Sequence, residues 1–363
     1  MAADGWHGDA TLVPECDLAG LPLARLEEFC AGLGLGPARA RRLFAWLHRP
    51  GPRDLGATGG LGREIRSRLA GRARIGRLEP AAVARSRDGT VKIAFRLEDG
   101  ATIESVLIPA AGRATLCVST QAGCAMGCRF CRTGAAGFRR DLTAAEIVNQ
   151  VAAARELLLA EGSGAPPRRH PIDNLVFMGM GEPLANYRNL LAALAVLGDE
   201  RGPAFSERRL TVSTCGLAAR IRDLGRDARV NLAVSLHTVD DAVRSELMPV
   251  NRSCGVDELL AACREFAGEG RRVVFFECVL LAGVNDTDAD ARRLAERLRG
   301  IPCRINLLEY NAEPSLPFRR SPAGRVTAFK DILHAAGHRT LLRHSRGADI
   351  AAACGQLAAG APP

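Results

Sequence analysis

The pattern of hydrophobic and polar positions changes twice along the chain. Up to about residue 75, amphipathic segments at 23–31 and 39–47 are separated by a Gly-Leu-Gly turn at 32–34, which predicts a small domain of short helices. Residues 91–97 and 102–109 instead alternate apolar with polar side chains on either side of a Glu-Asp-Gly-Ala turn. This alternation predicts an antiparallel hairpin, and we expect it to form a small linker sheet.

From about residue 114 the pattern becomes strand, loop and helix, repeated. Thr143 and Glu146 are placed to form a capping box at the start of one of these helices. Strands that alternate with helices imply right-handed βαβ units and a parallel sheet, and six units are too few for a closed eightfold barrel. We therefore expect a partial (β/α)6 barrel. The expected strands are 116–119, 174–178, 210–214, 231–236, 273–280 and 304–310, with a short last strand from 340; the expected helices include 144–159, 256–266 and 289–298.

These patterns divide an α/β protein into four parts. The length of 363 residues fits one large domain with a smaller appendage, and an apolar fraction of 47% allows a sizeable core. We expect a helical accessory domain of the helix-hairpin-helix type at 1–75, the antiparallel β linker at 76–112, the partial barrel at 113–345, and a C-terminal loop and tail at 346–363.

Arginine dominates the charge of the chain. The formal net charge is +9, and almost all of the 49 basic residues are arginine. Cations gain by displacing counterions from phosphate backbones, so this balance favours a nucleic acid partner. A GC-rich genome that favours arginine codons would give the same excess without any partner. No apolar run approaches the roughly 18–20 residues of a membrane span and no secretory signal is visible, so we expect a cytoplasmic protein that contacts no membrane.

The cysteines point to chemistry. Twelve cysteines without a secretory signal indicate thiols, metal ligands or catalytic groups, and seven scattered ones, Cys215 among them, are expected to be small core residues. Cys124, Cys128 and Cys131 lie within eight residues in a CxxxCxxC spacing. Three thiolates on one loop can hold an iron–sulfur cluster and leave one iron open, whereas ferredoxins use another spacing and a fourth cysteine. A zinc ion completed by a distant ligand is the alternative, although structural zinc sites prefer four ligands in two separated pairs.

Polar residues and glycines follow several of the expected strands. The strand at 174–178 runs into Gly181 and Glu182, where glycine lets the backbone approach a ligand and the carboxylate can pair with a cationic amine. The carboxyl ends of barrel strands share one face, so we expect ligand contact there. The other candidates at such ends are Ser213, Ser235, Leu236, His237 and Asn311.

The cysteine triplet, with Phe130 just before its last cysteine, resembles the cluster motif of the radical S-adenosylmethionine (SAM) superfamily. The resemblance implies a 4Fe–4S cluster that is held by the three cysteines and binds SAM through its open iron. It also implies that Glu182 and the other strand-end candidates contact SAM. One-electron reduction, with a flavodoxin or ferredoxin as electron donor, would then yield a 5′-deoxyadenosyl radical.

Further motifs are similar to those of the RlmN and Cfr family of RNA methyltransferases. They are Glu-Ser-Val-Leu-Ile-Pro at 104–109, Cys-Val-Ser-Thr-Gln-Ala-Gly-Cys at 117–124, Gly-Met-Gly-Glu-Pro at 179–183, Ser-Leu-His at 235–237 and Ala-Cys-Gly-Gln-Leu at 353–357. The resemblance implies methylation of adenine C2 at adenosine 2503 of 23S rRNA and adenosine 37 of tRNA, with two SAM molecules per turnover. We expect the protein to be a monomer.

The same resemblance implies three catalytic roles. Cys354 accepts a methyl group from one SAM, and after a second SAM has been cleaved the methyl carbon joins adenine C2. Glu104 takes the C2 proton, and Cys117 attacks the sulfur of Cys354, so a disulfide forms as the methylated base departs. RNA contact is expected from arginine-rich segments near the barrel mouth, namely Arg129 and Arg132, Arg139 and Arg140, Arg208 and Arg209, Arg319 and Arg320, and residues 343–346.

Two other functions remain open at this point. The Cfr branch methylates adenine C8 instead and shares nearly all of the motifs. A non-enzymatic iron–sulfur or zinc protein that binds RNA and senses redox state is the second alternative. Such a sensor would need neither Glu182, Ser213 and Asn311 nor a reactive Cys354.

Overall fold

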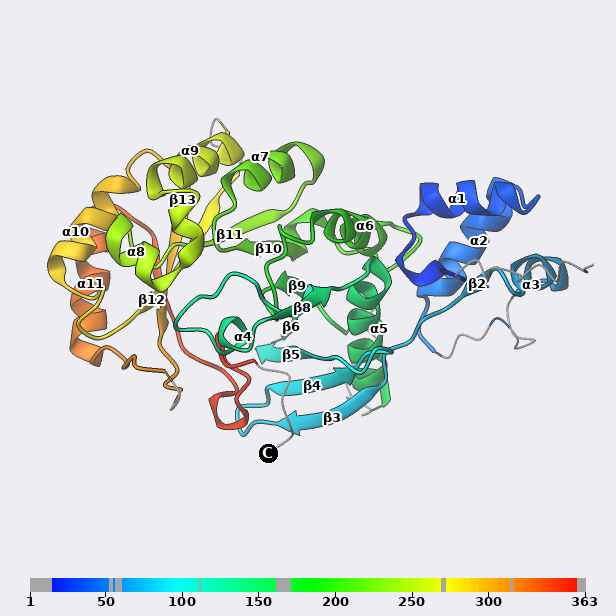
Figure 1. Cartoon of the computed structure of the whole chain (residues 1–363), viewed down its shortest axis with the longest axis horizontal. Helices are drawn as coiled ribbons and strands as arrows, with labels where there is room; N and C mark the ends of the chain where they lie inside the picture. Colours follow the sequence, from blue (N-terminus) through cyan, green and yellow to red (C-terminus); the bar gives the residue numbers. More distant parts are fainter. Residues whose placement is uncertain are drawn as a thin grey trace, which may run out of the picture.

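The computed structural model of the chain describes residues 15–51, 55, 61–110, 112–160, 171–268, 272–313 and 316–357. One curved sheet runs through most of the molecule, and helices line its outer face (Figure 1). This arrangement confirms the expected α/β fold. In spatial order the ten strands are β14 (Thr340–Arg343), β13 (Cys303–Glu309), β12 (Val274–Leu280), β11 (Asn231–Ser235), β10 (Leu210–Thr214), β9 (Asn174–Phe177), β6 (Arg113–Cys117), β5 (Thr102–Ala110), β4 (Val91–Arg96) and β3 (Pro80–Arg85).

Seven of these strands form the parallel part of the sheet. β6 pairs parallel with β9, and each strand from β9 to β14 then pairs parallel with the next. The strand expected at 210–214 has the same bounds in β10, and the seventh strand, β14, is the short one expected from residue 340. The sheet is open, because β14 and β3 at its two edges each have one neighbouring strand.

The hairpin expected between residues 91 and 109 forms, but the sheet around it is not a separate one. β3, β4 and β5 pair antiparallel in succession, as the alternating pattern predicted. β5 also pairs antiparallel with β6, from Val106 opposite Cys117 to Ala110 opposite Arg113. The predicted antiparallel linker is therefore continuous with the parallel part of the sheet. Joining β6 satisfies the backbone groups along the second edge of β5, which would otherwise be an exposed strand edge.

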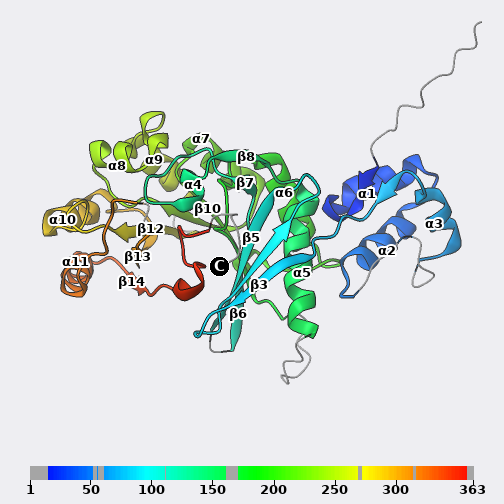
Figure 2. The same ribbon diagram turned by 60° about the horizontal axis from the view of Figure 1, so that its bottom comes forward.

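Helices connect the parallel strands and cover the outer face of the sheet (Figures 1 and 2). The capping box at the first of them is confirmed, since the Thr143 N–H donates to Glu146 Oε2 at 2.8 Å and the Glu146 N–H donates to Thr143 Oγ1 at 3.2 Å. None of the described helices is both long and apolar enough to cross a membrane. The helices are α5 (Ala144–Ala160), α6 (Tyr187–Gly198), α7 (Ala218–Asp227), α8 (Asp241–Leu247), α9 (Val256–Ala267), α10 (Asp288–Arg297) and α11 (Ala323–Ala335).

A helical lobe lies at one end of the molecule, beyond α5 (Figure 2). Its backbone meets α5 so closely that a Cβ on Gly20 would lie 2.3 Å from the Ala145 nitrogen. The Arg155 guanidinium on α5 also donates to His48 O at 3.0 Å, so the lobe is attached to α5 by packing and by a buried hydrogen bond. The lobe contains α1 (Leu23–Gly32), α2 (Pro37–His48), α3 (Arg63–Leu69) and the short parallel pair β1 (Cys16–Asp17) and β2 (Ala73–Arg74).

Candidate active site

The cysteine triplet lies on a loop at the end of the sheet where the parallel strands finish (Figure 1). The short strand β7 (Gln121–Gly123) precedes the loop, α4 (Arg132–Ala135) follows it, and β7 pairs antiparallel with β8 (Phe138–Asp141). The Arg129 N–H donates to Leu247 O, at the end of α8, at 2.9 Å. The loop is thus held on one side by β8 and on the other by α8.

The three thiols are neighbours that influence one another. All three cysteines are half-buried. Burial raises the pKa of Cys124 to about 11, and negative charge on Cys131 and Glu182 adds to this rise. Burial also raises the pKa of Cys128, again with a contribution from the other two cysteines. Thiols in such surroundings ionise most readily when they bind a cation, which makes the loop suitable for metal ligation.

The donor set fits a cluster better than a single structural zinc ion. Structural zinc sites prefer four ligands in two separated pairs. The three cysteines lie together on one loop, and a four-iron cluster held by three thiolates keeps one iron open for a ligand. The CxxxCxxC loop therefore favours the iron–sulfur alternative.

Gly181 and Glu182 lie beside this loop, although with partners that the sequence did not predict. Gly181 has a φ of +94°, and a Cβ there would lie 2.4 Å from the Cβ of Gln121, so close packing against Gln121 already requires glycine. The Glu182 carboxylate is buried and accepts the N–H of Cys215 at 2.7 Å and the N–H of Leu184 at 3.0 Å. Burial raises its pKa, and these backbone donors oppose that rise. The side chains of Cys215 and Thr214 also hydrogen-bond to this carboxylate.

A buried arginine joins the ends of β10 and β11. The side chain of Arg244, on α8, is fully buried and donates to Cys215 O at 2.7 Å and to Asn251 Oδ1 at 2.7 Å. It also donates to Ser235 O and Leu236 O at 3.2 Å each. Because Leu247 on the same helix accepts a bond from the cysteine loop, α8 couples that loop to the strand ends. Ser213 and Ser235 are half-buried at those ends.

His237 braces the cysteine loop through its ring. The residue is buried with a φ of +60°, a conformation that is uncommon outside glycine. The Val279 N–H donates to His237 Nδ1 at 3.1 Å, which leaves the proton of the neutral ring on Nε2. Burial, aided by Arg244, lowers the pKa of His237 to about 3, so the ring is neutral near pH 7. It packs edge-on against Phe130 with ring centroids 4.7 Å apart.

Asn311 connects the last candidate strand end to the C-terminal loop. Its Nδ2 lies 3.5 Å from Cys354 O, at the limit of a hydrogen bond. Its Oδ1 is buried and has no hydrogen-bond partner within the described structure. A buried amide oxygen without a donor is costly, and a ligand N–H or O–H would satisfy it. This orphaned acceptor fits a polar ligand such as SAM beside the cysteine loop.

The structure brings Cys117 and Cys354 together from distant parts of the sequence. Cys117 ends β6 and is buried; burial, with a contribution from negative charge on Cys354, raises its pKa. Cys354 is exposed, yet the protein packed around its thiol, then Glu277 and Cys131, raise its pKa to about 11. The Arg132 N–H donates to Gly355 O at 2.8 Å, so the Cys354 loop rests against α4.

Glu104 is also buried, on the strand next to Cys117. Only 5% of Glu104 is exposed, although its strand belongs to the predicted linker. Its carboxylate forms an ion pair of 3.2 Å with Lys92 on β4. In the sheet, Val106 lies opposite both Lys92 and Cys117, so Glu104, two residues from Val106, faces the same side as those two side chains.

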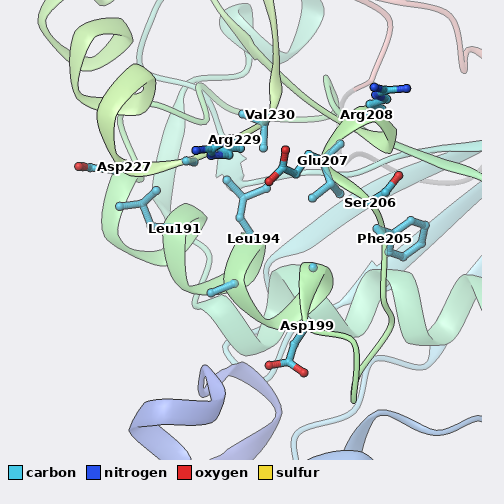
Figure 3. A pocket seen from close by; sticks show the side chains of 14 residues that line it. Leu191, Leu194, Asp199, Phe205, Ser206, Glu207, Arg208, Asp227, Arg229 and Val230 are labelled. Carbon is cyan, nitrogen blue, oxygen red and sulfur yellow. The ribbon is translucent and has the colours of Figure 1, made fainter.

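A groove at the opposite ends of β10 and β11 has a different character (Figure 3). It encloses about 660 Å³ and lies where Leu210 and Val230 lead into the two strands. Arg208 lies in this groove, so the expectation that Arg208 and Arg209 are near the barrel mouth was wrong. They precede β10, whereas the cysteine loop lies beyond the carboxyl ends of the strands, and parallel strands separate these two edges.

Sequence reasoning missed Arg244, Cys215 and Lys92. Cys215 is the buried core residue that was expected. It also lies beside the site, since negative charge on Glu182 and Cys128 contributes to the rise in its pKa, after burial. The helix that carries Arg244 was not among those predicted, and no local pattern marks this arginine as buried. The sequence does distinguish Lys92 in one respect, because only two of the 49 basic residues are lysine.

Comparison with known proteins agrees with this geometry. Residues 118–295 match the family model described as Radical SAM superfamily, and residues 16–75 match the model described as Ribosomal RNA large subunit methyltransferase N-terminal domain. A protein of Anaeromyxobacter dehalogenans named Dual-specificity RNA methyltransferase RlmN is 50% identical over 347 residues, which are 96% of this chain and 93% of that protein. A protein of the same name from Desulfotalea psychrophila is 47% identical over 342 residues, 94% of each. The crystal structure of a radical SAM methyltransferase from Sphaerobacter thermophilus matches with a TM-score of 0.88 and 45% identity over 95% of this chain and 100% of that one.

Proposed function

We propose a function from one premise: this chain belongs to the RlmN family of radical SAM methyltransferases. It methylates C2 of adenine in RNA, at adenosine 2503 of 23S rRNA and adenosine 37 of tRNA. The relatives are named dual-specificity RNA methyltransferases, which supports RNA as the substrate. The observation that carries the proposal is the pair of Cys117 and Cys354, which are 237 residues apart in sequence and yet near enough for the charge of Cys354 to affect the pKa of Cys117.

The cofactors have residues to hold them. Cys124, Cys128 and Cys131 would bind the 4Fe–4S cluster, and the orphaned Oδ1 of Asn311 is suited to a donor group of SAM. Glu182 and the ends of β10 and β11, with Ser213, Ser235, Leu236 and His237, would line the rest of the SAM site. When bound, SAM and the cluster supply a methyl group and the radical that breaks a C–H bond of that methyl group. The electron comes from a flavodoxin or ferredoxin.

The two cysteines act in turn. Cys354 Sγ takes up the methyl group as a thioether and releases its thiol proton to solvent. The methyl carbon loses a hydrogen atom, which the radical chemistry of bound SAM would take up, and forms a bond to adenine C2. C2 then releases its proton to Glu104 and one electron, which the cluster would accept, so that the adduct has paired electrons before the next step. Cys117 Sγ then attacks Cys354 Sγ, the carbon–sulfur bond breaks with its electron pair on carbon, and that carbon takes a proton to become the methyl group. An external dithiol reduces the resulting disulfide for the next turnover.

Both thiols are protonated near pH 7. Burial raises the pKa of Cys117, and burial together with Glu277 and Cys131 raises the pKa of Cys354 to about 11. Each thiol must therefore lose its proton before it reacts as a nucleophile. Glu104 is the proton acceptor for C2, since it is a buried carboxylate on the sheet face that also carries Cys117. RNA reaches the site with the target base out of its stack.

The test is product analysis with a matched cysteine control. Anaerobically reconstituted protein is incubated with SAM, a reductant and an unmodified fragment of 23S rRNA, and nucleosides are identified by mass spectrometry. We expect 2-methyladenosine from the wild-type protein and none from Cys354→Ala, whereas Cys16→Ala in the N-terminal lobe keeps the product. The same assay with tRNA tests the second substrate.

Other products would assign other functions. A product methylated at C8 would place the protein in the Cfr branch. Cleavage of SAM without methylated RNA would keep the radical chemistry and reject the RNA substrate. No cleavage of SAM by protein with a full complement of iron would favour the redox sensor.

A further inference from the structure

Lysine is almost absent from this chain. Of 49 basic residues, 47 are arginine, and the two lysines are Lys92 and Lys330. A bias toward arginine codons would replace lysine wherever either cation serves. A lysine that persists in a buried position therefore indicates that the compact ammonium group is needed there. Arg and Lys differ in this respect, because guanidinium is a planar fork and ammonium is a small point charge with three rotatable donors.

The ammonium group of Lys92 has two partners in the described structure, from two different parts of the chain. Its Nζ lies 3.2 Å from Glu104 Oε1 and donates to Ala351 O at 3.3 Å. The side chains of Lys92 and Glu104 are only 13% and 6% exposed. A buried ion pair is sensitive to the loss of one partner, since the remaining charge is left without compensation. Lys92 therefore ties the carboxylate of Glu104 to the loop that carries Cys354.

Ala351 lies three residues before Cys354, in a backbone conformation that needs support. It follows η4 (Ala348–Ile350) with a φ of +49°, in the left-handed region that alanine rarely adopts. Such strain persists only where the surrounding contacts hold it. The hydrogen bond from Lys92 fixes the direction of the Ala351 carbonyl, and thereby the path of the next residues toward Cys354.

The beginning of the same loop is held by the turn between β3 and β4. The Gly347 N–H donates to Asp88 Oδ2 at 3.0 Å, and Arg346 pairs with the same oxygen at 3.1 Å. Ser86 Oγ donates to Asp349 Oδ1 at 2.6 Å. These contacts fix where the loop starts, whereas the Lys92 contact lies nearer to Cys354 and also reaches Glu104.

Lys92, Glu104 and Cys117 share the inner face of the sheet. Ser105, the neighbour of Glu104, points the other way and donates to Gln150 on α5 at 2.8 Å. Side chains alternate along a strand, so Glu104 faces away from α5. Lys92 reaches across to Glu104 from β4, and Cys117 lies on β6 at the other side of β5.

We propose that Lys92 is a positioning residue that holds the proton acceptor Glu104 and the Cys354 loop in a fixed mutual arrangement for methyl transfer to RNA. This inference rests on the proposed function. Loss of the arrangement affects the chemical steps more than RNA binding, because the reacting groups lose their alignment while the basic surface is unchanged.

The test compares three substitutions in cluster-loaded protein. We expect Lys92→Met to lower kcat by about 100-fold with little change in KM for RNA. We expect Lys92→Arg to remain well below the wild type, because the guanidinium does not fit the two acceptors of the ammonium. Lys330→Arg is the matched control, since it makes the same change at a half-buried position on α11, outside the site. It should keep wild-type activity.

A double-mutant cycle separates positioning from general destabilisation. In a Glu104→Gln background, the change Lys92→Met should cost less in kcat than it does in the wild type, because the ion pair is already broken and only the hydrogen bond to Ala351 O is then lost. Hydrogen exchange of the protein without substrates gives a second readout. Amides of residues 351–355 should exchange faster in Lys92→Met, while those of β4 and β5 keep their protection.

Wild-type kcat in Lys92→Arg, or additive losses in the cycle, would overturn the inference. If Lys92→Met does not fold, Lys92→Gln replaces it in the cycle, since its amide still donates to Ala351 O without the charge. Failure of the proposed function looks different, because the wild-type protein itself would then give no 2-methyladenosine. The hydrogen-exchange comparison remains decisive in that case, as it requires no turnover.

Discussion

Strands β10 and β11 run from the groove at their amino ends to the cysteine loop at their carboxyl ends, and charged side chains are exposed at the first edge but buried at the second. At the amino ends, the charged side chains of Glu207, Arg208 and Arg229 are exposed around the groove (Figure 3). At the carboxyl ends, Glu182 and Arg244 are buried, and each is held by several hydrogen bonds. Buried charges need such partners, whereas exposed ones are solvated by water. The carboxyl edge is therefore a prearranged polar site, and the amino edge is not.

The largest effect should follow from removing the buried cation. We expect Arg244→Met to lower the free energy of unfolding by about 3–5 kcal/mol, because it leaves the carbonyls of Cys215, Ser235 and Leu236 without their donor. Since α8 also anchors the cysteine loop, bound iron should fall as well. Urea unfolding and iron analysis measure both effects. Unchanged stability would mean that the carboxyl edge is not prearranged by Arg244.

Two glycines allow the effect of close packing on the free energy of unfolding to be separated from the effect of backbone conformation. Gly181 and Gly283 both have positive φ, of +94° and +74°, but only Gly181 has neighbours within 4 Å of an added Cβ. Gly283→Ala should cost about 1 kcal/mol through the backbone alone. Gly181→Ala should cost about 2 kcal/mol or more, because the Cβ also meets Gln121. Equal losses in urea unfolding would show that Gln121 moves away easily.

The contacts of Asp88 with Arg346 and Gly347 in the C-terminal loop should weaken at low pH. Partial burial opposes ionisation of Asp88, but hydrogen bonds from Thr90 and the Gly347 amide outweigh it and hold its pKa below the ordinary value of 3.8. A depressed pKa means that the stabilisation is present above the ordinary value and is lost as the pH falls through the folded value. Amides of residues 346–349 should therefore lose protection below about pH 4.

A variant separates this effect from general acid unfolding. In Asp88→Asn the amides of residues 346–349 should exchange faster than in the wild type at pH 7. The difference in exchange rate between the two proteins should shrink as the pH falls. Protection that does not differ at pH 7 would contradict a role for the Asp88 charge.

The smallest effect is expected at the amino edge. Arg208 lines the groove and is exposed, so Arg208→Ala should change the free energy of unfolding by less than about 0.5 kcal/mol. It should also leave the methylation rate unchanged. A loss of activity comparable to that of a change at Glu182 would mean that both edges take part in function.

The sequence alone determined the order of elements and the chemistry of the cysteine loop. Periodicity fixed the parallel strands and the capping box of Thr143 and Glu146, because both depend on neighbours within a few residues. The spacing of Cys124, Cys128 and Cys131 likewise carries its information locally. The family resemblance of the motifs was confirmed by relatives that are 45% or more identical over nearly the whole chain.

Only the tertiary structure decided which distant residues meet. The union of the β linker with the main sheet depends on the edge of β5 finding β6. The bridge from Lys92 to Glu104 and Ala351 joins positions that are up to 259 residues apart. The buried position of Arg244 depends on four acceptors from other segments. Burial and long-range hydrogen bonds arise from packing of the whole chain, so no local pattern of side chains encodes them.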